Sequence, residues 1–218
     1  MNGPPRGSEL AVLLREAAEG RFPPADGRVE VIGAPPGPAD AVVAFSAHNV
    51  VAADLDGADV RARLPSEDPG APMSAAFLTW LGDRLGSEPG MVDLVMVSFA
   101  RTDRGLGLIE RDDLDTHPRV LRSRRYRTGV RVYSAQDGRG VVTVGAGLAG
   151  RLEVSVDVVP GARGRGVGTA LAIAATSLVP SGEPLYAQVS PGNVASVRAF
   201  LRAGYRPICS EVLFLRTR

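Results

Sequence analysis

The chain has 218 residues, of which 44% are hydrophobic, and its 25 basic and 24 acidic residues give a formal net charge of +1. This length and composition predict a soluble globular protein with one large domain, or with one domain and a smaller partner, and the near-neutral charge argues against nucleic acid or a membrane as a partner. The single cysteine, Cys209, excludes an intrachain disulfide and a cysteine-rich metal site.

The N-terminal part is predicted to contain both helices and strands. Apolar residues recur at helical spacing from Leu10 to Gly20, and a β-rich segment runs from Val29 to Ile32. The stretch AVVAFSAHNVVAADL has two β-rich halves about a polar centre, which predicts either a hairpin or a bent strand. Ser74 is the predicted N-cap of a second helix, which ends at Gly86.

The C-terminal half has a more regular order of elements. Met91 to Ala100 is apolar on both alternating faces, which is typical of a central strand that is covered on both sides. The remaining patterns predict a short helix over 118–127, strands over 130–135, 141–146 and 152–159, a helix over 166–178, a strand over 185–190, a helix over 193–202 and a final strand over 208–215.

Two glycine-rich stretches could each bind a phosphate, and their contexts distinguish them. The first, Gly145-Ala-Gly147-Leu-Ala-Gly150, has the spacing of a dinucleotide-binding loop. Such a loop works only where its third glycine opens a helix, because the pyrophosphate lies on the free N–H groups of that helix. After Gly150 the pattern has a period of two, so a strand follows. We therefore interpret this stretch as a hairpin connection whose glycines supply left-handed backbone angles.

The second stretch runs from Val159 to Gly168 and is followed at once by TALAIAATSLV, a segment of high helix propensity. Its glycines let backbone N–H groups approach a ligand, while the helix N-terminus, Arg163 and Arg165 add positive charge. This arrangement predicts a pyrophosphate cradle. The Lys-Ser/Thr pair of a P-loop is missing, so a nucleoside triphosphate with magnesium is poorly supported.

Two motifs in this half resemble those of the GNAT N-acetyltransferase superfamily. Arg163-x-x-Gly166-x-Gly168, at the end of a predicted strand, resembles the acetyl-CoA signature of that superfamily. Its helix-to-strand motif is similar to Asn193-x-x-Ser196-x-x-x-Phe200-x-x-x-Gly204-Tyr205. The resemblance covers the chain from about residue 130 to the C-terminus, extends to residue 91 through the order of elements, and is absent before that.

The resemblance implies an α/β (α+β) fold, the GNAT fold, in which a mixed and mostly antiparallel central sheet is flanked by helices. It implies an acetyltransferase domain over residues 89–218, with residues 1–88 as an N-terminal α/β extension that we expect to shape the substrate site. It also implies acetyl-CoA as cosubstrate, held where the strand that ends at Val158 splays from the strand over 185–190. The cofactor-binding residues that it implies are Val156, Val158, Arg163, Gly164, Arg165, Gly166, Val167, Gly168, Thr169 and Asn193.

The predicted catalytic groups depart from the family pattern. Acetyl transfer to an amine needs an oxyanion donor, which the resemblance places at a backbone N–H near Val158, and benefits from a base. Many members have a tyrosine as general acid where this chain has Phe200, and some have a glutamate base where it has Gln188. Glu153 is the best remaining base, because a carboxylate in a valine-rich strand lies close to the expected reaction centre; its alternative is a solvated strand position. Weaker candidates are Asp157 and Tyr186.

Several polar residues have a structural alternative. Asn193 is either a helix cap alone or a cap that also contacts the cofactor. Tyr205 is expected to pack behind the last helix. His48 and His117 lack ligand spacing, so no metal is expected. An arginine cluster could bind the cofactor's 3′-phosphate, an acidic substrate or a nucleic-acid backbone, or form a solvated helix face. Its members are Arg119, Arg122, Arg124, Arg125 and Arg127.

The sequence thus predicts an acetyl-CoA-dependent N-acetyltransferase that acts on a primary amine of a small molecule. The alternative is a non-catalytic sensor or scaffold that binds CoA or acyl-CoA, and a third interpretation makes the N-terminal portion a degenerate acyltransferase half. We expect a cytoplasmic location, because the sequence shows neither an export signal nor an apolar stretch of membrane-spanning length. A homodimer is left open.

Overall fold

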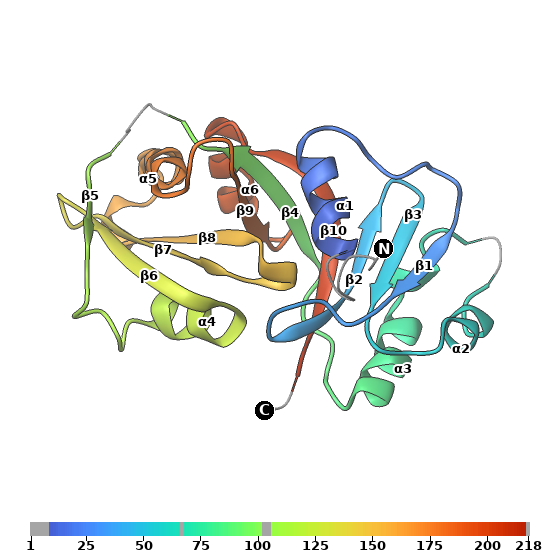
Figure 1. The fold of residues 1–218 in the computed structure, drawn as a ribbon. Helices are drawn as coiled ribbons and strands as arrows, with labels where there is room; N and C mark the ends of the chain where they lie inside the picture. The colour runs from blue at the N-terminus through green and yellow to red at the C-terminus, as the bar shows by residue number, and fades with distance from the viewer. Residues whose placement is uncertain (1–8, 66–67, 102–105, 217–218) are drawn as a thin grey trace, which may run out of the picture. The chain divides into compact units, whose positions relative to one another are not determined.

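The computed structural model describes residues 9–65, 68–101 and 106–216. Within them the chain forms ten strands and six α-helices and divides into two compact units (Figure 1). The first unit comprises Met1–Leu94, Leu148–Gly150 and Ile208–Arg218, and the second comprises Val95–Gly147 and Arg151–Pro207. Strands pair both antiparallel and parallel, with β1 parallel to β3 and β8 parallel to β9, and antiparallel pairs predominate, so the predicted fold class is confirmed.

The first unit is a four-stranded sheet with helices. Its strand order is β1-β3-β2-β10, in which the C-terminal strand β10 pairs antiparallel with β2. The predicted hairpin-or-bent-strand segment is a hairpin, because β2 and β3 pair antiparallel from Phe45↔His48 onward. The elements are α1 (Glu9–Ala18), β1 (Val29–Ile32), β2 (Ala39–Phe45), β3 (His48–Ala52), α2 (Gly57–Ala62), α3 (Ala75–Leu85) and β10 (Arg206–Leu215).

Helix α3 supplies much of the core of this unit. Phe77 and Leu81 are buried with Val42, Val51 and Phe214 in one apolar cluster. As predicted, the helix begins where the Oγ of its N-cap serine accepts the N–H of Phe77 at 3.3 Å, and it ends at a glycine with φ 62°. Helix α2 was not predicted, because its six residues bury a single valine and present no apolar periodicity.

The second unit has the strand order β4-β9-β8-β7-β6-β5. The predicted elements of this half are present, and the short strand β5 was missed because it lies in a stretch that has no regular pattern. The elements are β4 (Asp93–Phe99), β5 (Leu108–Glu110), α4 (Pro118–Tyr126), β6 (Thr128–Ala135), β7 (Gly140–Ala146), β8 (Leu152–Val158), α5 (Val167–Ala175), β9 (Pro184–Val189) and α6 (Val194–Arg202).

Helix α4 covers one face of β6, β7 and β8, and α5 covers the opposite face of β7 and β8 (Figure 1). Side chains of β8 alternate between them, as in any strand. Ser155 reaches α4, where its Oγ lies 3.0 Å from the Oγ of Ser123. Val158 reaches α5, where its methyl group lies 3.6 Å from the position of a Cβ on Gly168. The even positions of β8 therefore face α5 and the odd positions face α4.

The stretch from Gly145 to Gly150 connects β7 and β8, and no α-helix opens after it, as predicted. The predicted role of its glycines is partly wrong, because only Gly150 among them has a left-handed φ, of 76°; the neighbouring Ala149 has φ 55°. Gly145 and Gly147 are needed for close packing instead: a Cβ on Gly145 would lie 3.0 Å from a backbone oxygen, and one on Gly147 would collide with the carboxylate of Glu153. Over the described ranges, no helix has both the length and the apolar character that a bilayer crossing requires.

Candidate functional site: a cationic cavity at a strand fork

Strands β8 and β9 run parallel but stay together only briefly. Their register pairs are Glu153↔Tyr186 and Val154↔Ala187, whereas β7 and β8 remain paired as far as Gly140↔Val158. Beyond Val154, β8 therefore has no partner residue on β9, and we call this opening the fork. The resemblance implied such a splay. Backbone groups along the fork edge of β8 can consequently hydrogen-bond a ligand, because no ladder uses them. The carbonyl of Val158 is an exception, since it accepts from Arg163 Nε at 3.1 Å.

The glycine-rich loop after β8 leads into an uncapped helix N-terminus. Gly164 and Gly166 have φ of 73° and 79°, and a Cβ on either would meet no atom within 4 Å. Gly166 is the N-cap of α5, and no side chain there accepts a hydrogen bond from the first turn. The first N–H groups of α5 and the positive end of its dipole are thus available to an anion.

The fork and this loop border one cavity of about 610 Å³, a size typical of small-molecule sites. All predicted cofactor-binding residues line it except Arg165, which is exposed. Because it is lined by Val156 and Val158 from the α5 face and by Asp157 and Arg119 from the α4 side, the cavity reaches both faces of the sheet. Its lining comprises Arg119, Val156, Asp157, Val158, Ala162, Arg163, Gly164, Gly166, Val167, Gly168, Thr169, Asn193, Ala195, Ser196, Arg198, Ala199, Phe200 and Arg202.

The cavity is strongly cationic. Four arginines line it, against a single acidic residue, Asp157. Within the described parts of the chain none of the four makes an ion pair; they are Arg119, Arg163, Arg198 and Arg202. Burial lowers the pKa of Arg119, although nearby Asp157 opposes this, and its Nε is buried with no hydrogen-bond partner. A guanidinium whose Nε is buried without a partner is stabilised when an anion enters.

The five clustered arginines in and just after α4 have different surroundings. Arg119 lines the cavity, whereas Arg127 is buried in the sheet. Arg124 pairs with Asp115 at 2.6 Å on the surface. The remaining two, Arg122 and Arg125, lie over the ring of Tyr126. The solvated-face interpretation therefore holds for Arg122, Arg124 and Arg125, which are exposed, and is wrong for Arg127, which is buried. Arg198 and Arg202 were missed in the sequence, where their spacing of four on one helix face was the available signal.

Helix α6 contributes Asn193 and Phe200. The Oδ1 of Asn193 accepts the N–H of Ser196 at 3.1 Å, so the residue is a helix cap that also lines the cavity. Phe200 is buried and stands edge-on to Tyr205 with ring centroids 4.9 Å apart. Tyr205 packs behind the helix, as predicted: its hydroxyl donates to the carbonyl of Ala172 at 3.2 Å, and burial raises its pKa. It is therefore not placed to donate a proton in the cavity.

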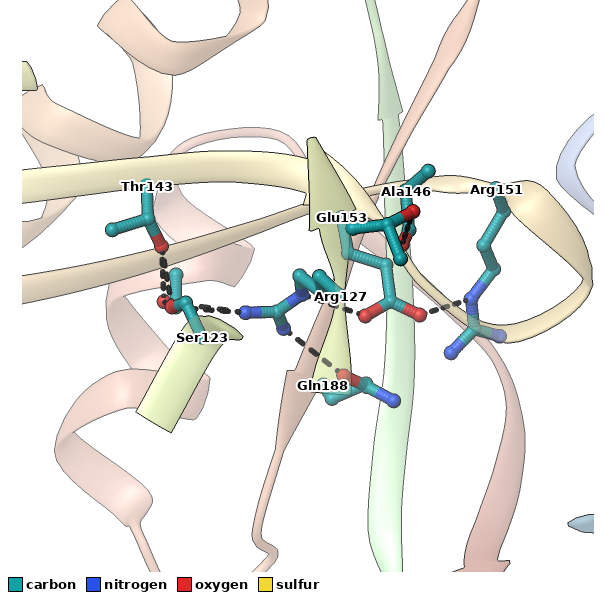
Figure 2. A network of polar contacts seen from close by, with 9 residues as sticks. Ser123, Arg127, Thr143, Ala146, Arg151, Glu153 and Gln188 are labelled. Carbon is teal, nitrogen blue, oxygen red and sulfur yellow. Dashed lines mark hydrogen bonds and ion pairs between the residues drawn. The ribbon is translucent and has the colours of Figure 1, made fainter. Parts of the chain in front are cut away.

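Glu153 lies at the closed end of the fork, on the α4 face, and is almost completely buried (Figure 2). Arg127 Nε donates to one of its carboxylate oxygens at 2.7 Å, and Arg151 Nε donates to the other at 2.8 Å. Burial alone would raise the pKa of Glu153, but the charges and hydrogen bonds of Arg151 and Arg127 hold it below its ordinary value. The alternative of a solvated strand position is thus wrong.

The two weaker candidates for a base, Asp157 and Tyr186, have different surroundings. Asp157 lines the cavity with its Oδ2 3.9 Å from His117 Nε2. His117 is the N-cap of α4, and its Nδ1 accepts the N–H of Arg119 at 3.1 Å. Tyr186 is buried, and the Cζ of Arg151 lies over its ring, 5.3 Å from the ring centroid. Among residues that the structure describes, no group of three or more His, Cys, Asp or Glu could hold a metal ion.

No protein-family model and no curated protein matches this chain. Among solved structures it is similar to a GCN5-related N-acetyltransferase from Kribbella flavida, with 16% identity and a TM-score of 0.42 over 65% of this chain and 64% of that one. A GNAT-family acetyltransferase from Colwellia psychrerythraea has 13% identity and a TM-score of 0.41 over 66% and 63%. A tandem GNAT protein from the clavulanic acid biosynthesis pathway has 16% identity and a TM-score of 0.42 over 80% and 62%. This chain thus spans less than two thirds of the length of these proteins, and its function has to be inferred from its own site.

Proposed function

We propose that this protein is an acetyl-CoA-dependent N-acetyltransferase that transfers an acetyl group to a primary amine of a small molecule. One observation carries the proposal. A single cavity combines the edge of β8 that has no partner on β9, the uncapped N-terminus of α5 and four arginines that form no ion pair with any residue the structure describes. CoA is a ligand with a pyrophosphate, a further phosphate and a long arm with amide groups, so its chemistry matches each of these parts.

The residues of the cavity divide naturally among the parts of such a ligand. The N–H groups between Gly164 and Thr169 would hold the pyrophosphate, where the α5 dipole adds to the charge of Arg163. The unpaired edge of β8 after Val154 would hydrogen-bond the amide groups of the arm. Arg119 has a buried Nε that lacks a partner, and it would contact a phosphate. Bound acetyl-CoA would supply the acetyl group as a thioester.

Both groups that we propose for acetyl transfer belong to β8. An unpaired N–H of β8 near Val158 would stabilise the oxyanion. Glu153 as general base stays a prediction, and its surroundings impose a condition. Both carboxylate oxygens accept from arginines and the pKa is lowered, so a guanidinium has to leave its oxygen before the carboxylate can take a proton effectively.

A second candidate function is a CoA-binding or acyl-CoA-binding module without catalysis. It is favoured by the cavity lining, which includes no tyrosine, cysteine or lysine among the described residues. The hydroxyl groups that line the cavity are those of Thr169 and Ser196. Neither is a strong acid for a departing thiolate.

Calorimetric titration with acetyl-CoA, followed by CoA-release assays with a panel of primary amines, tests both functions. Saturable binding together with steady CoA release that depends on an amine supports the enzyme. Tight binding without release across amino acids, polyamines and aminoglycosides supports the binding module. If neither acetyl-CoA nor CoA binds, both functions are wrong.

A further inference from the structure

Arg127 connects the two strands of the fork at the point where they separate. It follows the last residue of α4, and its side chain is buried in the second unit. Its Nε donates to Glu153 of β8, and its Nη2 donates to the Oε1 of Gln188 of β9 at 3.0 Å (Figure 2). Gln188 immediately follows Ala187, the last paired residue of β9. One guanidinium therefore bridges β8 and β9 next to their last register pair.

The third nitrogen of Arg127 is held by hydroxyl groups. Nη1 lies 3.3 Å from the Oγ of Ser123 and 3.5 Å from the Oγ of Ser155. Those two hydroxyls and that of Thr143 lie 2.7 to 3.0 Å from one another, which joins α4 to β7 and β8. A planar group with donors in fixed directions suits this place, since a lysine ammonium could not reach all these acceptors at once.

The backbone around Arg127 leaves room for this arrangement. A Cβ on Gly145 would lie 3.2 Å from the Cβ of Arg127, and one on Gly147 would collide with the carboxylate of Glu153. Arg151 holds the second oxygen of that carboxylate from the opposite side. Residues of β8, β9 and α4 thus hold the guanidinium of Arg127. Glycines occupy the positions where the neighbouring backbone lies closest to Arg127 and Glu153.

We propose that Arg127 is a positioning residue that fixes the closed end of the fork between β8 and β9. It acts through Glu153 and Gln188, and it thereby sets how far the edge of β8 beyond Val154 stands from β9 and from Asn193, which lines the cavity. This inference deepens the proposed function and rests on it. The ligand class is an acyl thioester of CoA.

The test uses Gln188→Leu, because this change removes the bridge and leaves both ion pairs of Glu153. Arg127→Met would leave Glu153 buried with one partner fewer and could unfold the chain. We expect Gln188→Leu to weaken acetyl-CoA binding about tenfold, because binding would then have to order a fork that the bridge no longer holds in place. Gln136→Leu is the matched control, since Gln136 is exposed in the turn between β6 and β7. It should bind acetyl-CoA as the wild type does.

Gln188→Glu provides the rescue. A carboxylate at this position accepts from Arg127 Nη2 with added charge, so acetyl-CoA affinity should return close to the wild-type value. A purely structural role would give another pattern: Gln188→Leu would lower the melting temperature but keep the wild-type dissociation constant for acetyl-CoA per folded molecule. That result overturns the proposal, and so does a Gln188→Glu variant that binds as poorly as Gln188→Leu.

Failure of the proposed function would look different. In that case the wild-type protein itself does not bind acetyl-CoA or CoA. Hydrogen exchange in the ligand-free protein then tests the bridge alone. Amides of β9 from Tyr186 to Val189 should exchange faster in Gln188→Leu than in Gln136→Leu, and equal exchange rates would show that Arg127 does not hold the fork.

Discussion

Gly147 lies directly against Glu153, so that a Cβ at position 147 would collide with the carboxyl carbon and both oxygens of that side chain. The carboxylate cannot move away easily, because an arginine donates to each oxygen. The glycine that gives this stretch its similarity to a dinucleotide-binding loop therefore serves the packing of a buried ion pair.

We expect Gly147→Ala to lower the free energy of unfolding by about 1 to 3 kcal/mol, because the added methyl group overpacks a site whose neighbours are fixed. Urea denaturation measures the change. Gly161→Ala is the control, since a Cβ on Gly161 would meet no atom within 4 Å and its φ is not left-handed. Equal unfolding free energies for Gly147→Ala and the wild type would contradict the packing described for Glu153.

Glu153 should make stability depend on pH in one direction. Its pKa is lowered in the folded state from an ordinary value of 4.5, so its stabilisation is fully present above that value and is lost as the pH falls through the folded-state pKa. Glu153→Gln should therefore cost about 3 to 5 kcal/mol at neutral pH and progressively less in acid. Unfolding curves of both proteins over a pH series measure the difference. A cost that is constant with pH would show that the ionised carboxylate is not what stabilises the fold.

The same variant tests the predicted base. If Glu153 accepts the proton of the amine, Glu153→Gln should lower kcat more near pH 7 than near pH 9, where more of the amine is already neutral. The rates are taken per folded molecule, with the folded fraction measured by circular dichroism. An equal loss at both pH values would leave Glu153 with its ion-pairing role alone.

Gly166→Glu should abolish acetyl-CoA binding in calorimetry, because it places a negative charge at the N-terminus of α5. Its control is closely matched: Gly182 has φ 78° against 79° for Gly166, and a Cβ on either glycine would meet no atom within 4 Å. Gly182→Glu therefore introduces the same charge and backbone strain away from the cavity, and it should bind normally. If both variants lose binding equally, strain rather than the anion site explains the loss.

Arg119→Met should weaken CoA binding by about 10- to 100-fold, which corresponds to the loss of one charge-assisted hydrogen bond. Arg122→Met on the exposed side of α4 is the control, and its affinity should stay near the wild-type value. Titrations with CoA and with dephospho-CoA separate the two phosphate groups: if Arg119 contacts the 3′-phosphate, the variant loses little affinity for dephospho-CoA. Wild-type affinity for CoA in Arg119→Met would exclude Arg119 from the site.

Most elements of the second unit could be predicted from the sequence, because their signals are local. The alternation of valines with polar residues defines β8, and glycines followed by alanines and leucines define the start of α5. Asn193 could be identified as a cap for the same reason, since a cap depends on a residue three positions further along the chain. Helix α2 and strand β5 were not predicted because each is too short to show a periodic pattern.

The sequence by itself determined the order of elements, the glycine loop that precedes α5 and the residues that could meet at a phosphate. Only the tertiary structure decided that Arg119 lines the cavity while Arg127, on the same short segment, is buried against Glu153. It also decided that β10 pairs with β2 of the N-terminal part, more than 160 residues earlier in the chain. The reason is physical: helix and turn signals come from neighbours along the chain, whereas ion pairs, close glycine contacts and strand partners depend on groups that only folding brings together.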